Sequence, residues 1–74
     1  MDVVEMLSQA MELPQGTLKG NEMLAEIEAW DSLALLNFLA LVDTNYGITL
    51  SPDTLLKCES IRDIHTLIKN GAKQ

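Results

Sequence analysis

The sequence predicts an all-α fold, a small four-helix bundle that spans residues 1–74 as one domain. The chain has only 74 residues, which suits one small domain with a thin hydrophobic core. Aromatic residues make up 4% of the chain and hydrophobic residues 47%, so aliphatic side chains and four methionines must build the core. Such a composition favours helices over a sheet. Apolar residues also recur at helical spacing in successive segments.

The first predicted helix covers residues 2–13 and leads into a long loop. Its apolar residues recur on one helical face, and Pro14 ends it. Residues 14–31 contain proline and glycine and form a loop, although several apolar side chains can pin this loop to a core. A loop of this length in so small a domain usually has a functional reason.

Residues 32–46 form the strongest helical pattern. Asp31 or Ser32 can cap this helix, and Gly47 can end it. One apolar stripe is expected to face the core and consists of Leu35, Phe38, Leu39, Val42 and Tyr46. A second apolar face consists of Leu33, Leu36 and Ala40. This second face fits either a central helix packed on more than one side or a docking stripe, and the pattern leaves both open.

Two further helices complete the predicted bundle. A short third helix covers residues 51–57, with Leu55 and Leu56 directed toward the core. The last helix covers residues 60–70 and begins with a variant capping box, Ser60-x-x-Asp63. Its apolar stripe consists of Ile61, Ile64, Leu67 and Ile68.

Acidic residues dominate the charge. The net charge is −6, and residues 1–53 carry nine acids and one base. This disfavours binding to nucleic acid or to an anionic membrane and favours a basic partner, although charged runs are often plain solvated surface. The chain shows neither a signal-peptide pattern nor a membrane-spanning run. We therefore expect a cytoplasmic monomer without membrane insertion.

Residues suited to catalysis or metal binding are sparse. The only histidine, His65, lies beside the apolar stripe of the last predicted helix and is expected to face solvent. The only cysteine, Cys58, has no Cys-x-x-Cys partner and is expected to be a small buried apolar side chain. Residues 43–47 resemble the start of a calcium loop but fail its spacing. We expect no metal site and no autonomous enzyme.

Ser32 occupies an unusual place, at the end of the long loop and the start of the strongest helix. A helix N-terminus offers free N–H groups and a positive dipole, which favour a phosphate. The plain alternative is a helix cap, because Asp-Ser before an apolar run is common at helix starts.

The segment Ala29-Trp30-Asp31-Ser32-Leu33, with the apolar positions that follow it, resembles the acyl carrier protein family. Residues 50–53 are similar to the start of that family's short third helix, and residues 60–68 to its last helix. The resemblance covers residues 2–70.

This resemblance implies that Ser32 carries 4′-phosphopantetheine, attached by a separate phosphopantetheinyl transferase. Asp31 would help to position the serine for the transferase and its Mg²⁺. The arm would carry acyl groups as thioesters, and the chain would be a non-catalytic carrier. Its partners would be acyl-activating, ketosynthase or acyltransferase-type enzymes of fatty-acid, polyketide or dedicated lipid-like pathways.

The same resemblance indicates partner-binding residues: Leu33, Leu36 and Ala40, with the acids Glu26, Glu28 and Asp43. Ala34 and Asn37 stand where acids are common in fatty-acid carriers, and Trp30 where a small residue is usual. Steering toward basic enzymes would then come mainly from the loop. These departures favour a specialised stand-alone carrier.

Two alternatives stay open. A peptidyl or aminoacyl carrier shares the chemistry of the arm, but the frequent Gly-Gly-x-Ser motif of such carriers is absent. A non-carrier adaptor would use the acidic helical surface only to bind a protein, and Ser32 would then serve only as a cap.

Overall fold

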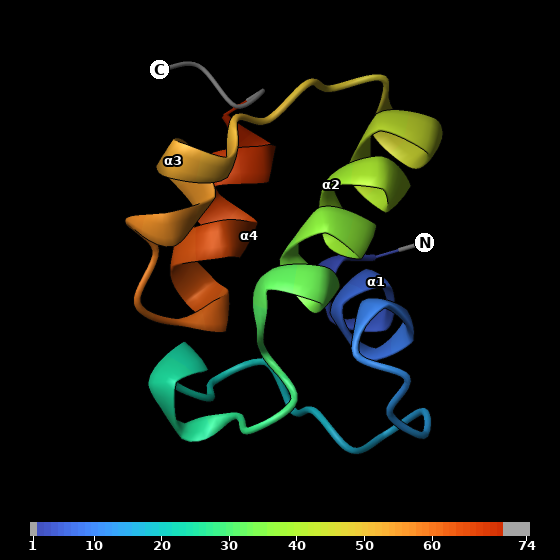
Figure 1. Cartoon of the computed structure of the whole chain (residues 1–74), viewed down its shortest axis with the longest axis vertical. Coiled ribbons are helices and arrows are strands. Elements are labelled where there is room, and N and C mark those ends of the chain that lie inside the picture. Colours follow the sequence, from blue (N-terminus) through green and yellow to red (C-terminus); the bar gives the residue numbers. More distant parts are fainter. Residues whose placement is uncertain (1, 71–74) are drawn as a thin grey trace.

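A computed structural model describes residues 2–70 and contains four α-helices in this range (Figure 1). They are α1 (Val3–Ala10), α2 (Ser32–Tyr46), α3 (Pro52–Leu56) and α4 (Ile61–Lys69), with a short 3₁₀ helix, η1, at Leu24–Glu26. Within the described range the only β-type pairing is one isolated antiparallel bridge, between Met23 and Ser60. The predicted all-α four-helix fold is confirmed.

Helix α1 ends earlier than the predicted range 2–13, which extends three residues beyond Ala10. Glu12 takes a left-handed conformation with φ 56°. The Leu13 N–H then donates to the Ser8 carbonyl at 2.8 Å and the Glu12 N–H to the Gln9 carbonyl at 3.1 Å. These two hydrogen bonds satisfy carbonyl groups in the last turn of α1. The chain therefore leaves the helical path at Glu12, two residues before Pro14.

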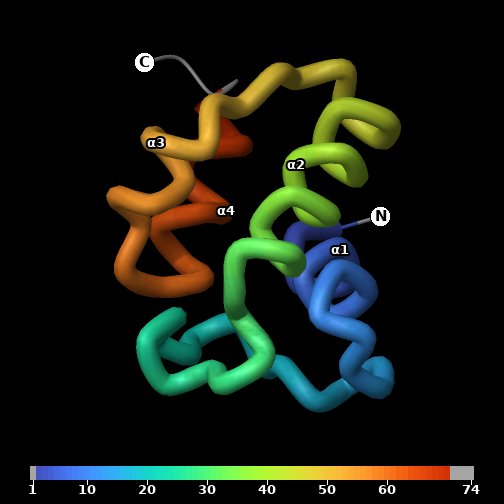
Figure 2. Tube along the Cα trace, viewed as in Figure 1, coloured from blue at the N-terminus to red at the C-terminus, as the bar shows by residue number. Residues whose placement is uncertain are grey.

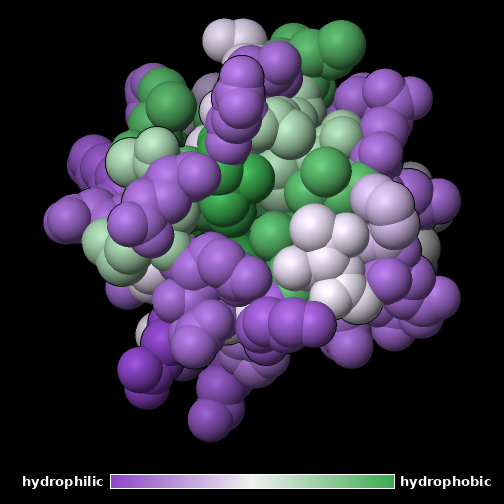
Figure 3. Space-filling view, turned by 90° about the horizontal axis from the view of Figure 1, so that it is seen from below, coloured by the Kyte–Doolittle hydropathy of each residue, from purple (hydrophilic) through white to green (hydrophobic). Residues whose placement is uncertain are grey.

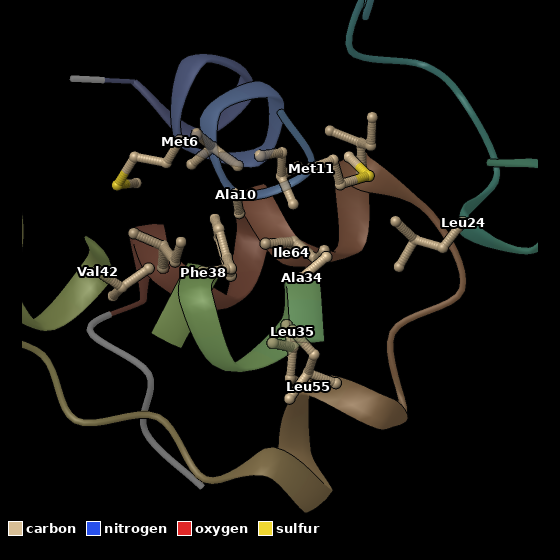
Figure 4. Close-up of a cluster of buried hydrophobic side chains, with 14 of the residues drawn as sticks. Met6, Ala10, Met11, Leu24, Ala34, Leu35, Phe38, Val42, Leu55 and Ile64 are labelled. Carbon is tan, nitrogen blue, oxygen red and sulfur yellow. The ribbon is translucent and has the colours of Figure 1, made fainter. Parts of the chain in front are cut away.

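The core lies where the four helices meet, and Figure 4 shows side chains from each of them pointing into one cluster. Its most deeply buried large side chains are Met6, Leu7, Val42, Phe38, Leu55, Ile61 and Ile64. Two loop residues, Leu18 and Leu24, are also buried in this cluster. The aliphatic and methionine core expected from composition is therefore present, with Phe38 as its aromatic member.

Two residues that were expected in the core, Tyr46 and Leu56, are exposed. Tyr46 was expected in the core stripe but is 41% exposed, because it lies in the last turn of α2, at the helix end. Leu56 was expected to face the core but is 68% exposed, since adjacent residues of a five-residue helix point about 100° apart and only Leu55 is buried. Ala34, which stands where acids are common in fatty-acid carriers, is buried in the first turn of α2.

The α1–α2 loop, residues 11–31, crosses the end of the bundle at which α2 and α4 begin (Figure 2). Its path is held by backbone hydrogen bonds to the start of α4. The Leu24 N–H donates to the Glu59 carbonyl at 2.9 Å, and the Ile61 N–H donates to the Glu22 carbonyl at 3.1 Å. Together with buried Leu18, these bonds attach the loop to the bundle.

The Glu22 carboxylate closes a tight turn within this loop. One oxygen accepts from the Lys19 N–H at 2.8 Å and the other from the Gly20 N–H at 2.9 Å. These two backbone donors, Lys19 first, hold the pKa of Glu22 below its ordinary value of 4.5.

We expect Glu22→Gln to lower the melting temperature at neutral pH and to have a smaller effect at about pH 3. A lowered pKa in the folded state means that the ionised carboxylate stabilises the fold above pH 4.5, and that this contribution is lost as the pH falls through the folded value. The change in melting temperature is measured at both pH values by thermal unfolding, monitored by circular dichroism. Glu59→Gln is the control, because within residues 2–70 no hydrogen bond engages the carboxylate of this exposed glutamate. An equal loss at both pH values would show that charge on Glu22 is not the cause.

Candidate functional site at the start of helix α2

Asp31 caps helix α2, and Ser32 is its first residue. The Asp31 backbone is extended, and its Oδ1 accepts a hydrogen bond from the Ala34 N–H at 2.9 Å. Its carbonyl accepts from the Leu35 N–H at 2.9 Å. The capping role that the sequence left open between Asp31 and Ser32 therefore belongs to Asp31.

The Ser32 side chain is exposed, and within residues 2–70 no hydrogen bond engages its hydroxyl. The Ala34 and Leu35 N–H groups are already used by Asp31, so the N–H groups of Ser32 and Leu33 remain at the positive end of the helix dipole. An exposed hydroxyl beside free N–H groups fits a covalently attached phosphate, whose charge these groups stabilise.

Trp30 anchors the chain immediately before this site. Its ring is partly buried and meets the ring of fully buried Phe38 edge to face, with centroids 6.2 Å apart and planes at 74°. The backbone N–H of Trp30 also donates a hydrogen bond to the Ile27 carbonyl at 3.1 Å. Trp30 is one of the apolar loop residues that the sequence predicts can pin the loop to a core, and its contact with Phe38 bears out that prediction.

The predicted docking stripe of α2 lies at the surface. Leu33 is 67% exposed, Leu36 is 57% exposed, and Ala40 is exposed as well. The sequence allowed two interpretations of these residues, a second packed side of the helix or a docking stripe. Their exposure rules out the packed side. Leu33 and Leu36 adjoin Ser32 within the first two turns of α2.

The three acids predicted to bind partners are all exposed, but they do not lie together. Glu26 and Glu28 belong to the loop segment that leads to Ser32. Asp43 is near the other end of α2, about 16 Å from Ser32 along the helix axis, at 1.5 Å per residue. The structure therefore places two of the three predicted acids on the serine end of the bundle.

The other chemically active side chains do not join this site. His65 is exposed on α4, as expected. Cys58, expected to be buried, is only partly buried because it follows the end of the short helix α3, and its Sγ lies 3.9 Å from the Thr54 carbonyl oxygen. Within the described residues no group of three or more His, Cys, Asp or Glu side chains could hold a metal. No helix in the same range is long and apolar enough to cross a membrane.

Burial, and secondarily the negative charge of Asp63, raises the pKa of the Cys58 thiol above its ordinary value. We expect iodoacetamide at pH 8 to alkylate Cys58 several-fold more slowly in the folded chain than in the urea-unfolded chain, because the thiolate is the nucleophile. A mass-spectrometric time course measures both rates, and free cysteine in each buffer is the reference. Equal rates in the two states would mean that the fold does not protect this thiol.

Residues 2–68 match the protein family described as the phosphopantetheine attachment site. Domains of this family carry covalent 4′-phosphopantetheine and are generally non-catalytic. The search of curated proteins and the search of solved structures each found no match. The family match covers nearly the whole chain, including all four helices apart from the last residue of α4.

Proposed function

This chain belongs to the phosphopantetheine attachment site family, and from this premise we propose that it is an acyl carrier protein whose 4′-phosphopantetheine is attached to Ser32. One observation carries the choice of residue. The Ser32 hydroxyl is exposed at the first position of α2, while Asp31 alone provides the helix cap. Ser32 is thus accessible to a transferase, and its side chain has no structural role in capping the helix.

The chain's own residues hold and present the arm, whose terminal thiol carries acyl groups as thioesters. The Ser32 oxygen forms the phosphodiester link, and the free N–H groups at the start of α2 stabilise its negative charge. Asp31 holds the serine at the helix end through its hydrogen bond to Ala34. Trp30 fixes the approach of the loop through its contact with Phe38.

Partner enzymes dock on the surface around Ser32. The exposed side chains of Leu33, Leu36 and Ala40 supply an apolar contact, and Glu26, Glu28 and Asp43 attract basic enzyme surfaces. The partners are a phosphopantetheinyl transferase and acyl-activating, ketosynthase or acyltransferase-type enzymes. We place the chain in a dedicated lipid-like, polyketide or fatty-acid pathway, with a specialised role favoured because α2 is poor in acids.

Intact-protein mass spectrometry tests this function directly. The chain is incubated with coenzyme A, Mg²⁺ and a broad-specificity phosphopantetheinyl transferase, and the modified peptide is then mapped. We expect one added arm, on Ser32. No addition with two different transferases, with the helices intact by circular dichroism, would overturn the proposal and favour the adaptor alternative.

Leu36→Glu is expected to weaken docking without unfolding the chain. Leu36 is 57% exposed, so a carboxylate there meets water in the free protein but enters the enzyme contact in the complex. We expect the KM for the transferase to rise about tenfold or more, with the melting temperature nearly unchanged.

Leu56→Glu is the matched control for this variant, since Leu56 is equally apolar and 68% exposed but lies on α3. It should change the KM much less. A loss of helical signal in Leu36→Glu would mean that Leu36 packs in the core. If Leu36→Glu and Leu56→Glu raise the KM equally, the apolar stripe of α2 has no special role in docking.

A further inference from the structure

A hollow of about 520 Å³ opens on the α1–α2 loop, outside the exposed stripe of α2. Its apolar walls come from Leu13, Leu18, Ile27 and Ala29, of which Leu18 is largely buried and the other three are partly buried. Figure 3 views the molecule from the side on which this loop lies, and it shows apolar surface near the middle of the face with hydrophilic surface around it. We call this feature the loop hollow.

Three glutamates line the loop hollow as well: Glu22, Glu26 and Glu28. Glu22 is held in place by the Lys19 and Gly20 N–H groups, which keep its carboxylate ionised at neutral pH. Lys19 is the only base among residues 1–53, and its ammonium group donates to the Gly16 carbonyl at 2.8 Å. The apolar walls of the hollow therefore carry a negative rim.

We propose that the loop hollow is a second docking site, which receives an apolar side chain of a partner enzyme between two lysine or arginine residues. The apolar walls favour burial of an aliphatic side chain, and the carboxylates favour cations on either side of it. An anionic lipid, a nucleic acid or a free fatty acid would meet like charge at this rim.

The position of the hollow connects it to Ser32. Ala29, in its wall, precedes Ser32 by three residues, and the loop crosses the end of the bundle at which α2 begins. An enzyme that receives the arm at this end can therefore contact the stripe of α2 and the hollow together, which strengthens binding beyond either contact alone. The identity of the partner rests on the proposed carrier function, whereas the occupant of the hollow is argued from its own walls and charge.

The test uses the full chain with Ser32 unmodified, and follows its amide signals by nuclear magnetic resonance during titration with two synthetic helical peptides. The first peptide has leucines along one face with lysines on both sides, and the second has glutamates in place of the lysines. We expect the lysine peptide to shift signals of Leu13, Leu18, Ile27 and Ala29, and the glutamate peptide to shift none of them. Larger shifts at Leu33 and Leu36 than around the hollow, or equal binding of both peptides, would overturn the proposal.

Matched variants separate the hollow from general charge attraction. Glu26→Gln/Glu28→Gln is expected to weaken binding of the lysine peptide about tenfold. The control Glu5→Gln/Glu12→Gln removes the same charge from two exposed residues outside the hollow and should change the affinity less than twofold. If both pairs of substitutions weaken binding of the lysine peptide equally, the effect comes from net charge alone, and the proposed docking site is wrong.

The apolar wall has its own test. Ile27→Ser keeps every carboxylate and should weaken binding as strongly as the glutamate pair, while Leu56→Ser, on α3, should not. If Ile27→Ser fails to fold by circular dichroism, Ala29→Gln fills the hollow instead and carries the same expectation. Unchanged binding by the folded wall variant would overturn the proposal. Because the unmodified chain is used, failure of Ser32 to accept an arm and failure of the hollow to bind are separate results.

Discussion

Ser32→Ala is expected to abolish attachment of the phosphopantetheine arm while the protein unfolds at nearly the wild-type temperature. The variant removes the hydroxyl that forms the phosphodiester. It removes no cap, because the capping hydrogen bond to the Ala34 N–H comes from Asp31. Alanine also has a helix propensity at least as favourable as that of serine. Intact-protein mass after incubation with coenzyme A and transferase, together with thermal unfolding, measures both effects.

Asp31→Ala is the matched control, because it leaves the hydroxyl and removes the cap. It should lower stability by about 1 kcal/mol, which corresponds to a melting-temperature decrease of about 4–8 °C for a domain of this size. Asp31→Asn keeps an oxygen that can accept from Ala34 and should recover most of this loss. If the Ser32→Ala chain still accepts one arm, the attachment site is a residue other than Ser32. If its melting temperature falls strongly, the Ser32 hydroxyl has a structural role.

Phe38→Ala is expected to produce the largest loss of stability of any single truncation in the chain, about 3–5 kcal/mol. Phe38 is fully buried in the cluster where the helices meet, and its ring is also the surface against which Trp30 packs. Small domains have stabilities near the lower end of the usual range of about 5–15 kcal/mol, so most of the folding free energy would be lost. Urea unfolding followed by Trp30 fluorescence measures it.

Phe38→Leu separates the volume of this side chain from its aromatic contact. Leucine fills most of the space, so the loss of stability should be much smaller, while the edge-to-face contact with Trp30 disappears. Leu39→Ala, at a partly buried position of the same helix, should lose less than Phe38→Ala. A Phe38→Ala chain that unfolds at the wild-type urea concentration would contradict the central position of this ring.

Much of the fold follows from short-range patterns. Ser60 and Asp63 cap α4 largely as their spacing indicates: Ser60 Oγ accepts from the Asp63 N–H at 3.2 Å, and Asp63 Oδ2 accepts from the Glu59 N–H at 3.0 Å. Gly47 ends α2 in a left-handed conformation with φ 66°. Such features depend on atoms within about one helical turn, so neighbouring residues determine them.

Burial at the helix ends could not be inferred in the same way. Tyr46 continues the apolar stripe of α2 in sequence, and Leu56 is as apolar as Leu55, yet both are exposed. Ala34 lies in the first turn of α2 and is buried. Periodicity shows which residues share a face, but burial depends on whether another helix or loop reaches that turn, and only the packed chain decides this.

The sequence by itself determined the all-α fold class, the excess of acids in the first part of the chain and the candidate serine at the start of α2. The tertiary structure decided that Asp31 is the cap and that Leu33 and Leu36 lie in solvent. It also placed the α1–α2 loop beside the start of α4, through pairing of Met23 with Ser60, and so shaped the loop hollow. Helices and caps arise from contacts between close neighbours in the chain, whereas this arrangement depends on contacts between residues far apart in it, which exist only once the core has formed.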